Sequence, residues 1–217
     1  MNSADLSYAL AIAGTVAFAV TAVLAVIPKG IDLFGACVMG IITAIGGGTI
    51  RDIVLDVPVF WATDLNYIWV ALASSIAAFY GNRFMERKNV YNLMLYLDGA
   101  GASMFAVQGA EKVIGLDFAM PLGPVILGVI TAIGGGLTRD VLAGRTTLLM
   151  KKELYALPMT VGASGYLIFM HWFPESGFLI GTTCALVAFA IRAAAIYWGL
   201  TTPKWMILGD KGIASKK

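Results

Sequence analysis

Seven long apolar runs limit the kinds of fold that this chain can adopt. Each run has the length, about 17–25 residues, that an α-helix needs to cross a bilayer. Inside lipid, a span must satisfy its own backbone polar groups, so these runs predict helices. The runs are Leu6–Ile27, Leu33–Ile50, Leu65–Asn82, Val90–Ala110, Pro121–Thr138, Leu154–Met170 and Ser176–Leu200. We therefore expect an all-α integral membrane protein with seven transmembrane helices.

The composition favours the same class. Of the 217 residues, 59% are hydrophobic and 13% are charged, and the mean hydropathy is +0.83. Soluble domains carry about 25% charged residues, so a soluble enzyme, a disulfide scaffold and a disordered chain are all disfavoured. The net charge of +2 and the absence of a basic patch argue against a nucleic-acid partner. Two isolated cysteines, Cys37 and Cys184, fit neither a zinc site nor a disulfide framework.

The distribution of basic residues predicts the orientation. If the N-terminus is outside, 13 of the 15 Lys and Arg residues fall inside, and only Arg51 and Lys112 fall outside. The positive-inside rule therefore favours N-out and C-in. No basic residue precedes Leu6–Ile27, so we interpret it as a retained transmembrane helix and not as a signal peptide. Arg192 is interpreted as a residue that snorkels to the inner interface.

A ten-residue segment occurs twice in the chain. Thr43–Asp52 reads TAIGGGTIRD, and Thr131–Asp140 reads TAIGGGLTRD, 88 residues later. The match extends upstream, where Phe18 returns as Phe105 after 87 residues. Spans one to three thus repeat as spans four to six, and because three is odd the second copy is inverted. Inverted repeats are typical of transport proteins. We divide the chain into two three-helix repeats, 1–88 and 89–172, and a seventh helix with a cytoplasmic tail, 173–217.

Each copy places three consecutive glycines inside a predicted span. They are Gly46, Gly47, Gly48, Gly134, Gly135 and Gly136. An interior glycine costs a helix about 1 kcal/mol relative to alanine, so some function should offset that cost. One interpretation is a kink that turns backbone carbonyls toward a water-filled pathway. The other is close packing of two helices through small residues, and the two can hold together.

Polar residues follow each glycine triplet and are candidates for the pathway. They are Thr49, Arg51, Asp52, Thr138, Arg139 and Asp140. Adjacent positions on a helix do not face each other, so we do not expect Arg51 to pair with Asp52. The inverted repeat suggests that Arg51 pairs with Asp140, and Arg139 with Asp52. The alternative is that these residues are span ends that have already reached the headgroups.

Asp98 is a further charge within a predicted span, and the matching region of the first copy, around Ala11, is uncharged. A carboxylate at membrane depth is a functional candidate, which could attract cations or carry a proton. The structural alternative is a carboxylate that only hydrogen-bonds to neighbouring helices. The chain contains no nucleotide-binding or enzyme motif, so we do not expect an enzyme.

The doubled motif, together with Asp32-Leu-Phe-Gly, Pro58-Val-Phe-Trp and the seven-span layout, resembles the prokaryotic branch of the TRIC family. These trimeric intracellular cation channels are also described as glycine-transporter-like or UPF0126 membrane proteins. The resemblance covers essentially the whole chain. It implies a homotrimer with a pore for potassium and sodium in each protomer, bounded by glycine-kinked second and fifth helices.

The resemblance also implies roles for particular residues. The six glycines would be the kink residues, and the polar residues after them would lie near the pore. No cofactor is implied beyond the permeant cation and bound lipid. The Lys-Glu-Val signature of the animal members is absent from this sequence. We therefore expect the plasma membrane of a prokaryote and no phosphoinositide binding of the animal type.

Two other functions remain open at the level of sequence. A secondary transporter of a small zwitterion such as glycine would use inverted repeats and broken helices equally well. Such a carrier would need a carboxylate for the ammonium group and an arginine for the substrate carboxylate. A structural membrane protein without transport is the third alternative. The glycine-interrupted repeats favour transport over that third alternative.

Overall fold

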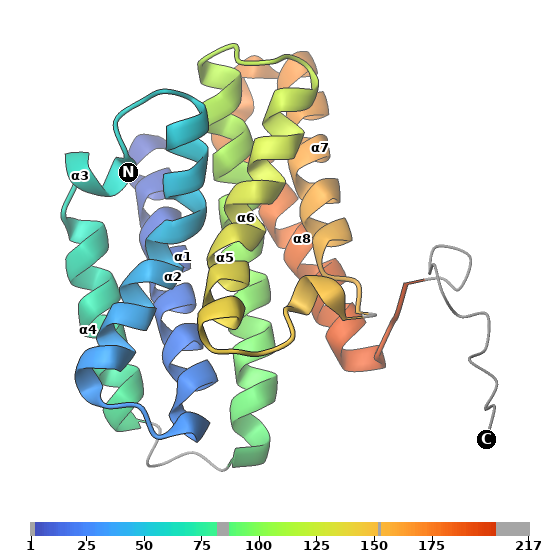
Figure 1. The fold of residues 1–217 in the computed structure, drawn as a ribbon. Helices are drawn as coiled ribbons and strands as arrows, with labels where there is room; N and C mark the ends of the chain where they lie inside the picture. Colours follow the sequence, from blue (N-terminus) through green and yellow to red (C-terminus); the bar gives the residue numbers. More distant parts are fainter. Residues whose placement is uncertain (1–2, 82–86, 152, 203–217) are drawn as a thin grey trace, which may run out of the picture.

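The computed structural model describes residues 3–81, 87–151 and 153–202, and the long elements of this part are all α-helices (Figure 1). Each of the predicted runs overlaps one of them. Their bounds are α1 Ser3–Val26, α2 Leu33–Val54, α4 Asn66–Gly81, α5 Arg87–Gly115, α6 Leu122–Leu142, α7 Ala156–Trp172 and α8 Gly177–Trp198. The loop around Arg83 and the basic tail beyond Thr202, which contribute to the orientation argument, lie outside the described residues.

Local sequence signals explain several helix ends. The Asp32 carboxylate accepts a hydrogen bond from the Gly35 amide at 2.7 Å and so caps the start of α2. Gly199 ends α8 in the left-handed conformation, with φ of 61°. A short helix that the sequence did not predict, α3 (Phe60–Thr63), follows α2. A 3-10 turn, Leu148–Met150, follows α6 at the matching place.

Four of the described helices are both long and apolar enough to cross a membrane. They are Tyr8–Lys29, Leu33–Val54, Leu122–Leu142 and Pro174–Trp198. The described part of α4 has 16 residues, and at 1.5 Å per residue this part extends over ~24 Å of the ~30 Å hydrocarbon core. The helix α5 is long enough, with 29 residues, but it contains Asp98, Glu111 and Lys112.

The two copies of the repeated segment run in opposite directions. In Figure 1, α2 ends near the end of the molecule that carries the N-terminus, whereas α6 ends near the opposite end. The helices α1 and α5 pack against each other, as do α2 and α6. The rings of Phe18 and Phe105, which are counterparts in the repeat, stack with centroids 5.4 Å apart. Counterpart residues thus meet at the middle of the molecule.

The glycine triplets lie where α2 crosses α6. A Cβ atom on Gly47 would overlap the carbonyl oxygen of Thr131, and one on Gly135 would overlap the carbonyl oxygen of Thr43. These two contacts are counterparts, because Thr43 and Thr131 are 88 residues apart like the glycines. Both helices remain α-helical through their triplets. The close-packing interpretation therefore describes what Gly47 and Gly135 do at this crossing.

Candidate functional site

The first charged cluster lies at the end of α2, around Asp52. Its Oδ1 accepts hydrogen bonds from Arg51 Nε and from Lys112 Nζ, both at 2.8 Å. Its Oδ2 accepts one from the backbone amide of Phe60 at 2.9 Å. Asp52 is completely buried, and Arg51 is 7% exposed. One carboxylate therefore holds two cations and also fixes the start of α3.

A second cluster, around Arg139, occupies the matching place at the end of α6. Arg139 Nε donates to Asp140 Oδ1 at 2.9 Å, and Nη1 donates to Asp98 Oδ1 at 2.6 Å. Nη1 also donates to Thr21 Oγ1 at 3.0 Å. Asp140 Oδ2 accepts the backbone amide of Leu148 at 3.2 Å, as Asp52 does with Phe60, 88 residues earlier. The two clusters are therefore built on the same plan.

The predicted pairing of these charges is wrong. Arg51 pairs with its neighbour Asp52, and Arg139 pairs with its neighbour Asp140. The rule for adjacent positions concerns the directions of the Cβ atoms, whereas an arginine side chain is long enough to reach the neighbouring carboxylate, at 2.8 Å from Arg51 Nη2 to Asp52 and at 2.9 Å from Arg139 Nε to Asp140. The cross-pairs fail because α2 and α6 diverge from the glycine crossing in opposite directions. From Gly47 to Arg51 and from Gly135 to Asp140 the rises sum to roughly 13 Å.

Asp98 lies within the second cluster and is completely buried, as Arg139 is. Together with Asp140 it gives this cluster two carboxylates for one guanidinium. Among the described residues, Asp98 Oδ2, Arg139 Nη2 and the Tyr155 hydroxyl have no hydrogen-bond partner. The Tyr155 oxygen and Arg139 Nη2 border Gly136, where a Cβ would lie 2.9 Å and 3.6 Å from them, and Asp98 borders it through its other oxygen, Oδ1, at 3.1 Å. The missing side chain of Gly136 therefore gives these polar groups room to meet.

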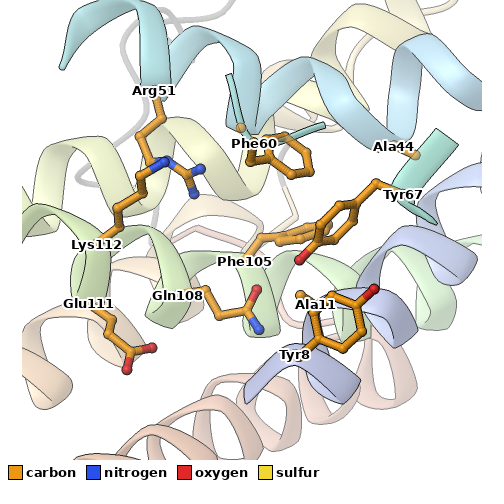
Figure 2. Close-up of a pocket in the computed structure, with 11 residues that line it drawn as sticks. Tyr8, Ala11, Ala44, Arg51, Phe60, Tyr67, Phe105, Gln108, Glu111 and Lys112 are labelled. Atoms are coloured by element: carbon orange, nitrogen blue, oxygen red, sulfur yellow. The ribbon is translucent and has the colours of Figure 1, made fainter. Parts of the chain in front are cut away.

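A cavity of about 260 Å³ opens beside the first cluster. Figure 2 shows Arg51 and Lys112 on one side of it, with Phe60, Tyr67 and Phe105 forming an aromatic wall. The guanidinium carbon of Arg51 lies 5.8 Å from the Phe60 ring centroid. The complete lining is Tyr8, Ala11, Ala44, Gly48, Arg51, Phe60, Tyr67, Phe105, Gln108, Glu111 and Lys112. Two cations share the single carboxylate of Asp52, so this cluster carries one excess positive charge.

The other predicted site residues lie outside the charged clusters. Thr49 Oγ1 donates to the Ile45 carbonyl at 2.8 Å and accepts from Trp61 Nε1 at 3.0 Å. Thr138 donates to the carbonyl of Gly134 at 2.8 Å. Gly46 lies at the crossing, where a Cβ would make ordinary contact with Thr138 Oγ1 at 3.7 Å. Both threonine hydroxyls are thus engaged by their own helices.

Several residues of the two clusters were not singled out from the sequence. Lys112 counted only as a charge on the outer side, yet it binds Asp52 directly. Tyr67 borders the first cavity, and Tyr155 borders the second cluster. These tyrosines are 88 residues apart, so the repeat itself contained a signal that could have found them.

Arg192 does not snorkel, which corrects a second prediction. It is completely buried, and it donates to the Leu154 carbonyl at 3.1 Å and to Glu153 Oε2 at 3.0 Å. Its guanidinium carbon lies 5.3 Å from the ring centroid of Tyr155. The side chain ties α8 to the segment before α7 because that segment supplies a free carbonyl and a carboxylate. A snorkelling side chain would instead extend to the interface.

Comparison with known proteins agrees with the repeat and the fold. The sequence model of the family described as "Glycine transporter" matches residues 8–83 and 95–171. The UPF0126 inner membrane protein YadS of Escherichia coli K12 is 36% identical over 93% of this chain and 97% of its own length. The UPF0126 membrane protein YvgT of Bacillus subtilis is 31% identical over 88% of this chain and 93% of its own.

Solved structures give the same result. The TRIC trimeric intracellular cation channel orthologue from Rhodobacter sphaeroides superposes with a TM-score of 0.83 at 33% identity, over 90% of this chain and 99% of that one. A prokaryotic TRIC channel crystallised in 0.5 M KCl also has a TM-score of 0.83, at 27% identity, over 91% and 98% of the two chains. The fold thus defines an α-helical membrane protein of the structural class that includes the TRIC channels.

Within that class, the chain belongs to the family that unites the glycine transporter model, the UPF0126 membrane proteins and the prokaryotic TRIC channels. The resemblance predicted from the doubled glycine motif is therefore confirmed. The relatives are membrane proteins and channels, which agrees with the prediction of a non-enzyme.

Proposed function

We propose that the chain is a monovalent cation channel for potassium and sodium, with a pathway through each protomer of a homotrimer. The observation that carries the proposal is the pair of like-built charged clusters at opposite ends of the α2–α6 crossing, one of them beside a cavity. The related solved structures, which are TRIC cation channels, support it. A charge pair at each end of a glycine-lined crossing suits an ion path because backbone and carboxylate oxygens replace water around a cation.

The proposed pathway runs from the cavity, past Gly48 and the crossing, to the Arg139 cluster. The glycines let the two helices approach closely along this line, where a Cβ on Gly134 would lie 3.0 Å from the Cα of Gly47. Asp52, Asp98 and Asp140 lower the electrostatic cost of a passing cation, while Arg51 and Arg139 raise it. The arginines therefore slow the passage of cations, and their pairing with buried carboxylates reduces that effect.

The proposed membrane arrangement has all seven long helices as spans. The helices α4 and α7, with 16 and 17 residues, then cross through local thinning of the bilayer. The N-terminus is outside and the C-terminus is in the cytoplasm of a prokaryote, because that orientation keeps most basic residues inside. The two inverted units are 1–88 and 89–172, and the segment 173–217 adds α8 and the tail. E. coli YadS is named an inner membrane protein, which supports this location.

The second candidate function is a carrier of a small zwitterion such as glycine. The cavity lining contains Arg51 and Lys112 and also Glu111, so it offers partners for a carboxylate and for an ammonium group. The description of the matching family as "Glycine transporter" favours the same substrate class. A carrier of this kind would saturate with substrate and would show no unitary currents.

Proteoliposomes distinguish the two functions in one preparation. We expect potassium efflux down its gradient, measured by a fluorescent indicator, and no saturable uptake of labelled glycine. Ala11→Phe places a ring in the cavity and should reduce the efflux, because Ala11 lines it. Ala13→Phe, on the exposed face of the same helix, is the matched control and should leave the efflux unchanged. Equal efflux from both variants would contradict a pathway that runs through the cavity.

A further inference from the structure

The cavity beside the first cluster has an aromatic corner. The rings of Phe60 and Tyr67 have centroids 4.7 Å apart and planes at 80°, and the rings of Tyr67 and Tyr8 have centroids 5.9 Å apart and planes at 74°. Phe105 adds a further ring to the same lining (Figure 2). Rings at nearly right angles enclose a space from several sides, as the walls of an aromatic cage do. Aromatic cages bind quaternary ammonium groups through the attraction between a cation and the ring faces.

Two cations lie beside this aromatic corner. The guanidinium carbon of Arg51 is 5.8 Å from the Phe60 ring centroid. Arg51 Nη2 and Lys112 Nζ both contact Asp52 Oδ1 at 2.8 Å. This contact requires only one N–H group of the Lys112 ammonium, so its other N–H groups can donate to a second anion. A ligand carboxylate would therefore find two cationic donors next to the aromatic corner.

The charged side chains at this cavity balance one another. Arg51, Lys112 and Glu111 line it, and Asp52 binds both of the cations. A ligand with a net charge would upset this balance in a partly buried place, where an unpaired charge is costly. A zwitterion adds no net charge, so it suits the cavity better than a simple anion or a simple cation does.

These rings and charges belong to one copy of the repeat. The positions that correspond to Tyr8, Phe60, Glu111 and Lys112 are occupied by Leu95, Leu148, Leu24 and Ala25. Those four residues of the second half pack together in one buried apolar cluster. The bonds that the two halves share, from an arginine and a loop amide to a carboxylate, need neither the rings nor the extra charges. The first half therefore has, in addition to the common plan, a cavity with the features of a ligand site.

The lining favours a methylated ammonium group over a primary one. Four aromatic rings line the cavity, against one carboxylate, that of Glu111. The Glu111 carboxylate already accepts a hydrogen bond from the Tyr166 hydroxyl. A primary ammonium that leaves water needs acceptors for its N–H groups, whereas a quaternary group has no N–H group to satisfy. Ring faces attract such a group without accepting a directed bond.

We propose that this cavity binds a small zwitterion with a carboxylate at one end and a quaternary ammonium group at the other, as in trimethylglycine. The ligand carboxylate accepts hydrogen bonds from Lys112 and Arg51, and the methylated ammonium lies against the rings of the aromatic corner. Because the cavity is the entrance of the proposed pathway, the bound zwitterion blocks the passage of cations there.

The inference rests on the proposed function only for the block of ion flux. Binding of the zwitterion is measured on the purified protein and needs no conduction. Binding without any potassium efflux would keep this site and reject the channel. Efflux from a protein that binds no zwitterion would keep the channel and reject this inference.

Equilibrium binding of radiolabelled trimethylglycine to the purified protein in nanodiscs tests the site. We expect saturable binding, and competition that strengthens with each methyl group from glycine to trimethylglycine, by at least tenfold in total. The anion of tert-butylacetic acid has the same shape and carboxylate, but carbon in place of the charged nitrogen. It should compete at least tenfold more weakly than trimethylglycine. No saturable binding, or equal competition by glycine or by the carbon analogue, would overturn the proposal.

The second half of the chain suggests the variants. Phe60→Leu and Tyr8→Leu each replace a ring by the residue at the matching position, and each should weaken trimethylglycine binding about fivefold to tenfold. Phe34→Leu and Tyr80→Leu are the matched controls, since these rings are 78% and 50% exposed and lie outside the lining. Tyr8 is 40% exposed, so its variant keeps the test valid if Phe60→Leu does not fold. Unchanged binding in folded Tyr8→Leu would overturn the aromatic corner as the ammonium site.

Potassium efflux from proteoliposomes tests the block. Saturating trimethylglycine on both sides of the membrane should reduce the efflux at least fivefold, relative to sucrose at the same osmolarity. The same concentration should reduce it less in Tyr8→Leu, because this variant binds the zwitterion more weakly. Full efflux at a concentration that saturates the binding site would contradict the block.

Discussion

At the scale of single residues, the buried carboxylates determine where the chain turns. Asp52 and Asp140 each bind an arginine through one oxygen and a loop amide through the other. A buried carboxylate requires such partners because its desolvation cost is large. The same residue that is part of the proposed pathway therefore also positions the segment that follows the helix.

Replacing Asp52 should destabilise the protein strongly. Asp52→Asn keeps the size of the side chain but leaves Arg51 and Lys112 without an anion. Removing one partner of a buried ion pair costs about 3–5 kcal/mol. We expect a clear decrease in the unfolding temperature in detergent. Asp56→Asn is the control, since Asp56 is exposed and asparagine tolerates its φ of 53°. A similar unfolding temperature for both variants would contradict the role of Asp52.

Arg192 should behave as an interior residue. Arg192→Ala removes hydrogen bonds to the Leu154 carbonyl and to Glu153, and bonds of charged groups contribute about 1.5–3 kcal/mol each. We expect a loss of stability of that order. Glu175→Gln, at an exposed carboxylate before α8 that lies outside this tie, is the control and should cost far less. If Arg192→Ala unfolds at the temperature of the parent protein, the side chain contributes no such tie.

At the scale of elements, the contact between α2 and α6 depends on three of the six glycines. Gly47 and Gly135 each face a carbonyl oxygen of the other helix, and a Cβ on Gly134 would lie 3.0 Å from the Cα of Gly47, whereas Gly46 has room for a methyl group. The triplets are alike in sequence but not in position. A substitution series along one triplet therefore separates packing from any wider role of the glycines.

Alanine at Gly47 should loosen this crossing. The added Cβ overlaps the Thr131 carbonyl, which is backbone and cannot rotate away. Overpacking of this kind typically costs about 1–3 kcal/mol. We expect a lower unfolding temperature for Gly47→Ala and also for Gly135→Ala. Gly46→Ala should be neutral or stabilising, because alanine is the better helix former. A neutral Gly47→Ala would contradict the observed packing.

The elements were largely predictable from the sequence. Apolar runs overlap the long helices, and the motif pair TAIGGG predicted the contact region of the repeat. The short helix α3 was not predicted because it depends on a bond from Phe60 to Asp52, which no local pattern reveals. The pairing of Arg51 was also missed. Asp52 was excluded as the partner of Arg51 by the rule that adjacent helix positions do not face each other. The side-chain conformation that lets Arg51 reach Asp52 depends on its buried surroundings, which no local pattern reveals.

At the scale of the whole molecule, the two ends of the proposed pathway differ in charge. Arg51 and Lys112 share the carboxylate of Asp52, and Glu111 lines the same cavity, so the formal charges around the cavity balance. Asp98 and Asp140 against Arg139 leave one excess negative charge at the other end. The cavity end therefore attracts a cation less than the other end, and we expect it to set the rate of entry.

Removing a positive charge from the cavity end should increase cation flux. Arg51→Gln leaves Lys112 paired one to one with Asp52, so the carboxylate of Glu111, which lines the same cavity, is no longer balanced. Removing one charge at ~7 Å in a watery cavity lowers the barrier enough for about a threefold gain in flux. The gain should shrink at high salt, where the Debye length falls to ~3 Å at 1 M. Lys29→Gln, an exposed residue outside the clusters, is the control. Unchanged potassium efflux for Arg51→Gln at low salt would contradict a barrier at this end.

The most direct test is a planar-bilayer recording of the purified protein in asymmetric potassium chloride. A cation channel predicts discrete unitary currents that reverse near the equilibrium potential of potassium. Reversal near the chloride potential would contradict cation selectivity. A silent bilayer, together with saturable glycine uptake into liposomes made from the same preparation, would contradict a channel and identify the carrier.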